Sequence, residues 1–111
     1  MAADRLDSRL SDLTSTWHPA VLRTIGMAAN AAGTMAMPIG VCGESAANPQ
    51  LAAVLIGLGV TSLSMAPSAL AEVRGFLASV DRATCLRAAL AVSNASSADE
   101  AKALAIEILG V

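Results

Sequence analysis

The stretch Met37-Pro-Ile-Gly-Val-Cys-Gly-Glu-Ser-Ala-Ala-Asn-Pro49 decides the fold of this chain. Its first part predicts a short buried strand over 38–42, because proline is tolerated at the first strand position and the β-branched residues that follow suit a pleated interior. Two glycines flank Cys42 and let other groups approach the backbone there. Asn48 is a helix cap and Pro49 a helix opener. The predicted unit is a strand, a turn carrying Cys42, and a helix.

A second strand is predicted at 61–65, with a helix over 49–58 between the two strands. Pro49 begins that helix, and it ends at Gly57 or Gly59. A strand, a helix and a strand in close succession predict a parallel pair. A thiol at the carboxyl end of a parallel strand lies where α/β barrels and doubly wound sheets hold their active sites. A single cysteine on a strand is nevertheless more often an inert packing residue.

Helices are also predicted on both sides of this unit. One starts at His18-Pro19, where His18, the one histidine of the chain, is interpreted as a helix cap rather than a phosphoacceptor. Another is opened by Pro67 and runs to about residue 80. The tail holds a helix over 82–92, on which Leu86, Ala89 and Leu90 are expected to face inward, and a last helix begins at the capping box Ser97-Ala-Asp-Glu100. Residues 81–111 are therefore predicted to form a helical hairpin appended to an α/β part, residues 1–80.

Composition excludes several classes of function. Seven lysines and arginines against nine acidic residues give no basic patch for nucleic acid. Cys42 and Cys85 show no metal-ligand spacing, which favours a reduced cytoplasmic chain over a disulfide framework. Apolar residues make up 55% of the chain, but the longest apolar run, Leu51 to Val60, is shorter than the ~20 residues of a spanning helix. We therefore expect no membrane insertion, and the first residues do not have the pattern of a signal peptide.

Two parallel strands do not make a complete sheet. Parallel sheets are normally covered by helices on both faces, and a two-stranded one leaves both edges open. The chain is therefore expected to be the last part of a larger α/β domain.

Five motifs, in order, resemble the enzyme I family of the bacterial sugar phosphotransferase system, a branch of the phosphoenolpyruvate-utilising enzymes. They are Met1-Ala-Ala-Asp-Arg5, His18-Pro-Ala-Val-Leu-Arg23, Gly40-Val-Cys-Gly-Glu44, Gly57-Leu-Gly59 and Leu63-Ser-Met-Ala-Pro-Ser-Ala-Leu70. The resemblance implies the C-terminal end of a (β/α)8 TIM barrel: its last two strands with their helices, followed by the helical hairpin.

The same resemblance implies a function. The family barrel binds phosphoenolpyruvate and Mg²⁺ and promotes dimerisation. The phosphoryl group passes to a histidine on a separate N-terminal domain and then to the phosphocarrier protein HPr. The family's Mg²⁺ ligands correspond to positions before Met1, and so do several substrate-binding arginines. This chain alone is therefore expected to be inactive.

Two positions match functional residues of the family, and a third is a candidate. Arg5 matches an arginine whose guanidinium would hold the phosphate or carboxylate of phosphoenolpyruvate through paired N–H donors. Cys42 matches the cysteine that protonates the enolate left after phosphoryl departure. A thiol with a reference pKa of about 8.5 is mostly protonated at neutral pH and can give a proton to carbon. Glu44 either orients the backbone of the site or favours the following helix start.

The chain departs from the family pattern at two places. Ala46-Ala47-Asn48 replaces the usual Ala-Gly-Asp, and Ala66 stands where a capping serine is common. Two other interpretations stay open, one because related enzymes share the barrel and the Cys-Gly segment, the other because the family's metal ligands are absent from this chain. One is a fragment of the related pyruvate phosphate dikinase or phosphoenolpyruvate synthase. The other is a non-catalytic module for dimerisation or interaction.

Overall fold

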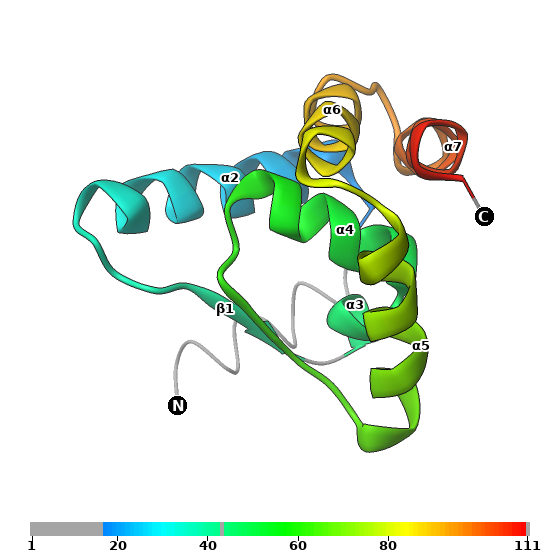
Figure 1. Ribbon diagram of the computed structural model, residues 1–111. Coiled ribbons are helices and arrows are strands. Elements are labelled where there is room, and N and C mark those ends of the chain that lie inside the picture. The colour runs from blue at the N-terminus through cyan, green and yellow to red at the C-terminus, as the bar shows by residue number, and fades with distance from the viewer. Residues whose placement is uncertain (1–16, 43, 111) are drawn as a thin grey trace.

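The structure of the chain is a computed structural model, and it describes residues 17–42 and 44–110. Arg5 therefore lies outside the described residues. Helices dominate the described part, and two short strands form a parallel sheet (Figure 1). In chain order the elements are α2 (Pro19–Thr34), β1 (Gly40–Cys42), α3 (Glu44–Ala47), α4 (Pro49–Leu58), β2 (Ser62–Ser64), α5 (Pro67–Ser79), α6 (Arg82–Ser93) and α7 (Ala98–Leu109).

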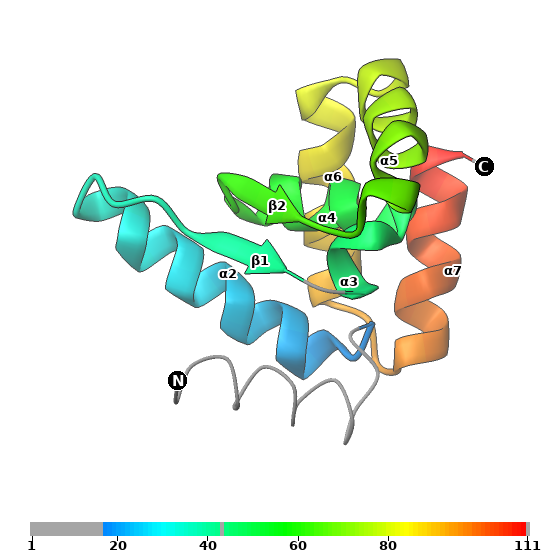
Figure 2. The ribbon, with the colours of Figure 1, turned by 90° about the horizontal axis from the view of Figure 1, so that it is seen from below.

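The predicted strand, helix and strand are present as β1, α4 and β2. The two strands are parallel, with Gly40 opposite Ser62 and Cys42 opposite Ser64. Figure 2 shows both arrows pointing toward the side of the molecule that carries α3 and the start of α5. The carboxyl ends of the strands therefore share one edge, and Cys42 lies at that edge.

The sheet is less buried than the sequence predicts. On β1 and β2 only the central residues, Val41 and Leu63, are half-buried, and both pack against the hydrophobic core. The residues that alternate with them are exposed. The prediction of a buried strand is wrong for this chain because its described residues supply only two strands and cover only one face.

The helices other than α3 begin where the sequence predicts. The Nδ1 atom of His18 accepts a hydrogen bond from the backbone N–H of Ala20 at 3.1 Å, so His18 caps α2 as expected. The side chain of Asn48 caps α4 by accepting from Leu51 N at 3.0 Å, and Ser97 caps α7 by accepting from Glu100 N at 3.1 Å. Pro67 opens α5, and Ala66 gives it no side-chain cap.

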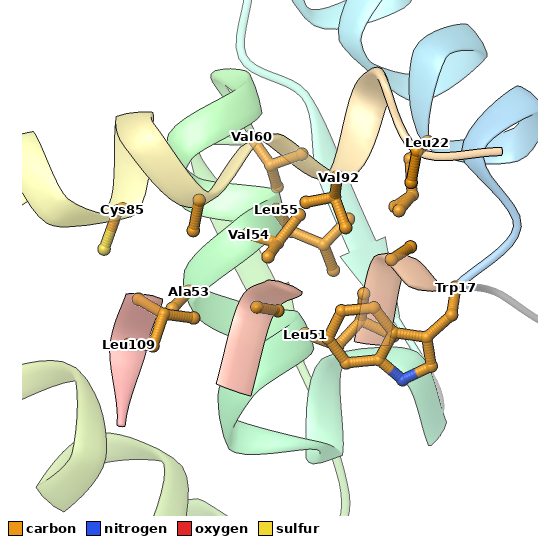
Figure 3. Close-up of a cluster of buried hydrophobic side chains, with 14 residues drawn as sticks. Trp17, Leu22, Leu51, Ala53, Val54, Leu55, Val60, Cys85, Val92 and Leu109 are labelled. Carbon is orange, nitrogen blue, oxygen red and sulfur yellow. The ribbon is translucent and has the colours of Figure 1, made fainter. Parts of the chain in front are cut away.

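The hydrophobic core joins four helices and is built largely from small residues. Leu51, Val54 and Leu55 of α4 are buried at its centre, between α2, α6 and α7 (Figure 3). α6 and α7 are consecutive and pack against each other, and both also contact α4. A further tie comes from Arg23 of α2, which donates a hydrogen bond to the backbone carbonyl of Ser93 at 2.7 Å.

Helix α6 presents a different face to the core from the one predicted. Cys85, Ala88, Ala89 and Val92 are its buried residues. Leu86 and Leu90 are 50% and 59% exposed, so the expectation that they face inward is wrong. The reason lies in how closely α6 approaches α4, which is set by small residues on both helices.

Gly57 marks that close approach. It lies inside α4, which ends one residue later at Leu58, and Gly59 supplies the left-handed C-cap with a φ of 108°. A Cβ atom added at Gly57 would overlap the backbone carbonyl oxygen of Cys85 and would lie 3.0 Å from the Cβ of Ala89. A leucine on this contact face would hold the two backbones apart.

Within residues 17–42 and 44–110, no helix combines the length and the apolar character needed to cross a membrane. The predicted boundary at residue 80, between an α/β part and a tail hairpin, stays a prediction.

Candidate functional site

Cys42 is the last residue of β1, and its side chain is exposed. The half-buried Val41 faces the helices, so Cys42 projects from the opposite face of the sheet, because successive side chains of a strand alternate between faces. The short helix α3 begins just after it, at Glu44. An exposed thiol therefore lies at the carboxyl ends of the parallel strands, open to a ligand that approaches from that side.

Three other positions share the face of Cys42. They are Gly40 on β1 and Ser62 and Ser64 on β2, and all three are exposed. The shared face is confirmed at the first register pair, where a Cβ added at Gly40 would lie 4.0 Å from Ser62 Cβ and 2.6 Å from Ser62 Oγ. This open face, Gly40, Cys42, Ser62 and Ser64, carries only small side chains.

No role is predicted above for either serine, although the sequence contains a signal for them. Ser62-Leu63-Ser64 alternates like Gly40-Val41-Cys42, and aligning the two strands by their apolar central residues brings Ser64 beside Cys42. Which polar residues of two strands lie side by side can be predicted only when the register between the strands is known.

The other two predicted site residues are Arg5 and Glu44. Arg5 lies outside the described residues, so its proximity to Cys42 stays a prediction. Glu44 is the first residue of α3, two positions after Cys42, where the sequence predicts a turn rather than a helix. A carboxylate at that position is compatible with favouring the helix start, and its other predicted role is not tested.

A cavity of about 490 Å³ lies at the opposite end of β2 from Cys42. Its walls come from the C-terminal ends of α4 and α5 and the start of α6, and include Val60, Thr61, Asp81 and Cys85. The cavity is thus separate from the carboxyl edge that carries Cys42. Cys85, which is 3% exposed, belongs to the hydrophobic core.

The chemistry of Cys85 differs from that of a reactive thiol. Burial raises its pKa above the ordinary value of 9.0, and the nearby carboxylate of Asp81 raises it further. Asp81 caps α6 by accepting a hydrogen bond from Thr84 N at 2.7 Å. Hydrogen bonds from Thr84 lower the pKa of Asp81, so this carboxylate stays charged beside the thiol. Thiolate formation at Cys85 is therefore disfavoured in the folded chain.

The raised pKa of Cys85 predicts a loss of stability in base. Because the folded chain holds the thiol proton more tightly than the unfolded chain, the stabilisation is fully present below pH 9.0 and declines as the pH rises through the folded pKa. Urea unfolding at pH 8 and pH 10 should show a larger loss for the wild-type chain than for Cys85→Ala. Equal losses in the two proteins would contradict this assignment.

The described residues contain no group of three or more His, Cys, Asp or Glu side chains that could hold a metal ion. The part of the chain that the structure describes therefore does not fit a Mg²⁺ site by itself. The expectation that the metal ligands correspond to positions before Met1 stays a prediction of the resemblance.

Comparisons with known proteins point to one family. Residues 1–82 match the family described as PEP-utilising enzyme, PEP-binding domain. The phosphoenolpyruvate-protein phosphotransferase of Streptomyces coelicolor is 48% identical over 97% of this chain, which corresponds to 19% of that protein. The proteins of the same name from Haloferax volcanii and Listeria monocytogenes are 40% and 32% identical over 75% and 90% of this chain, and 15% and 18% of their own lengths.

The chain thus spans about a fifth of the length of the first relative. The match to the family runs from the first residue through β1, β2 and α5, and it includes both Arg5 and Cys42. It ends at the start of α6, and the similarity to the Streptomyces coelicolor protein continues over nearly all the rest. This chain belongs to the family of PEP-utilising enzymes and corresponds to a C-terminal part of their PEP-binding domain, as found in phosphoenolpyruvate-protein phosphotransferases.

Proposed function

We propose that this chain forms the C-terminal end of the phosphoenolpyruvate-binding (β/α)8 barrel of a phosphoenolpyruvate-protein phosphotransferase, and that Cys42 is its proton donor. The observation that carries the proposal is the exposed thiol at the carboxyl edge of the parallel pair β1 and β2. Active sites of (β/α)8 barrels lie at this edge. The open face of the sheet and the outer sides of β1 and β2 are the surfaces that the further strands of a barrel would cover.

In the proposed reaction, phosphoenolpyruvate gives its phosphoryl group to a histidine on another domain, and the enolate of pyruvate is left behind. The S–H bond of Cys42 then breaks as its proton forms a new C–H bond at C3 of the enolate, and the product is pyruvate. The thiolate that remains regains a proton from water before the next turnover. General acids placed in this way typically contribute about 10²- to 10⁴-fold to a rate.

Apart from Glu44, the other components of the proposed reaction lie outside the described residues. We assign Arg5 to the phosphate or carboxylate of phosphoenolpyruvate, through the paired donors of a guanidinium. Glu44 supports the backbone after Cys42. The complete enzyme would use Mg²⁺ held by residues preceding this chain, form a homodimer, act in the cytoplasm, and pass phosphoryl groups to HPr through an N-terminal domain. The 111-residue chain alone should release no pyruvate.

A hybrid enzyme tests this proposal. The segment of the Streptomyces coelicolor relative that matches this chain would be replaced by this chain, because the two are 48% identical over 108 residues. We expect the hybrid to release pyruvate from phosphoenolpyruvate and to phosphorylate HPr. A folded hybrid that binds its partner subunit but releases no pyruvate would favour the non-catalytic module, and formation of ATP from phosphoenolpyruvate would favour the dikinase or synthase.

A further inference from the structure

We propose that Ser64 is a positioning residue whose hydroxyl donates a hydrogen bond to the sulfur of Cys42 and stabilises the thiolate that remains after proton transfer. The inference rests on the proposed function because it takes Cys42 to be the proton donor. Its structural basis is the register of the two strands, which pairs Cys42 with Ser64.

The first register pair shows how near such side chains lie. A Cβ added at Gly40 would be 4.0 Å from Ser62 Cβ, and Ser62 Oγ leans toward β1 to within 2.6 Å of that position. Side chains of a parallel pair repeat this arrangement every two residues on the same face. Cys42 and Ser64 form the next pair on this face, two residues further along each strand. Rotation about their Cα–Cβ bonds therefore brings the hydroxyl within hydrogen-bonding reach of the sulfur.

Within the described part of the chain, the elements packed against β1 offer no cationic side chain that would stabilise a thiolate at Cys42. The elements packed against β1 are β2 and α3. β2 carries no charged residue, and Glu44 is the one ionisable residue of α3. α4, against which Val41 packs, has none. Because a carboxylate disfavours a thiolate, a neutral hydroxyl donor is the favourable partner that these elements offer to the sulfur.

The chemistry of the step gives the hydroxyl a purpose. When the S–H bond breaks, negative charge develops on the sulfur, and a prepositioned donor stabilises that charge without reorganisation of solvent. Ser64 keeps its own proton throughout. A hydroxyl held by the strand register also limits the rotamers of the thiol, so the proton is delivered to one face of the enolate.

Alkylation of the 111-residue chain with iodoacetamide tests this inference, with the extent of modification at Cys42 mapped by mass spectrometry. We expect Ser64→Ala to slow alkylation about threefold at pH 7.5, since a hydrogen bond to a charged group is lost. The pH of half-maximal rate should move upward, while the limiting rate at high pH should stay equal or rise slightly, because a more basic thiolate is more nucleophilic.

Two variants act as matched controls. Ser64→Thr keeps the hydroxyl and should restore the wild-type pH profile. Ser62→Ala removes a hydroxyl from the same face of β2 but from the pair opposite Gly40, so it should leave the profile unchanged. Far-UV circular dichroism confirms that each variant has the same helical content as the wild-type chain.

The inference is overturned if Ser64→Ala leaves the rate at pH 7.5 unchanged, lowers the rate equally at every pH, or matches Ser62→Ala. Equal slowing at every pH would mean altered access to the thiol rather than altered thiolate stability. Because alkylation needs no turnover, these outcomes concern Ser64 alone. The proposed function is tested separately: it would be wrong if the hybrid enzyme still turned over after Cys42 had been replaced.

Discussion

Replacing Cys42 by alanine in the hybrid enzyme is expected to lower kcat for pyruvate release about 10³-fold, within the range contributed by a general acid. The KM for phosphoenolpyruvate should change much less, because the thiol makes no charged contact with the substrate before phosphoryl transfer. A loss confined to kcat is the signature of an interaction made in the transition state. Steady-state pyruvate formation, coupled to a lactate dehydrogenase assay, measures both constants.

Cys85→Ala is the matched control for this substitution. Both variants remove one sulfur, but Cys85 is 3% exposed and belongs to the hydrophobic core. Its replacement should lower the midpoint of thermal unfolding and leave kcat within a factor of about two, since it touches no reacting atom. If Cys42→Ala retained the wild-type kcat, the assignment of Cys42 as proton donor would be wrong.

Replacing Gly57 by alanine should destabilise the chain by about 3 kcal/mol, the upper part of the range for overpacking a core. The added Cβ would lie against the backbone carbonyl of Cys85, only 2.6 Å from its carbon atom. A backbone group cannot rotate away as a side chain can, so α4 and α6 must separate. The free energy of unfolding, measured by urea titration, should fall accordingly.

Gly75→Ala provides a control with the opposite expected sign. Gly75 lies within α5, and no atom lies within 4 Å of an added Cβ. Alanine there gains helix propensity and restricts the unfolded chain, which together stabilise by about 0.5 to 1 kcal/mol. If Gly57→Ala and Gly75→Ala changed the free energy of unfolding in the same direction, that result would contradict the close crossing of α4 and α6.

The starts of all the described helices except α3 were predictable from the sequence because their determinants are local. Pro19, Pro49 and Pro67 each open a helix at the expected residue. His18 and Asn48 supply side-chain caps, as a residue with a short polar or imidazole side chain can do before the first turn. The existence of the parallel pair followed from the same kind of reasoning, because a strand, a helix and a strand in close succession leave few alternatives.

The packed face of α6 was not predictable in this way. Hydrophobicity alone favours Leu86 and Leu90 as core residues, yet both are exposed and Ala88 and Ala89 are buried. The deciding factor is the distance between two helix backbones, which depends on Gly57, about thirty residues earlier in the chain. Periodicity identifies an apolar stripe but does not report how near the partner helix comes.

The candidate site also combines a feature that local sequence predicts with features that depend on distant parts of the chain. The position of Cys42 at the carboxyl end of a strand follows from local patterns, and the structure has it there. Its neighbour Ser64 follows only from the register between strands that are separated by the whole of α4. The convergence of Arg5 with Cys42 depends on a segment outside the described residues, and it stays a prediction of the resemblance.

Protection of Cys42 by substrate is the most direct test of the central claim that this thiol faces bound phosphoenolpyruvate. In the hybrid enzyme, alkylation by iodoacetamide would be followed separately at Cys42 and Cys85, with and without saturating phosphoenolpyruvate and Mg²⁺. We predict that substrate slows modification of Cys42 at least about tenfold and leaves Cys85 unaffected, because a bound ligand blocks only the thiol that it contacts. An unchanged rate at Cys42, in an enzyme shown to bind phosphoenolpyruvate, would contradict the account.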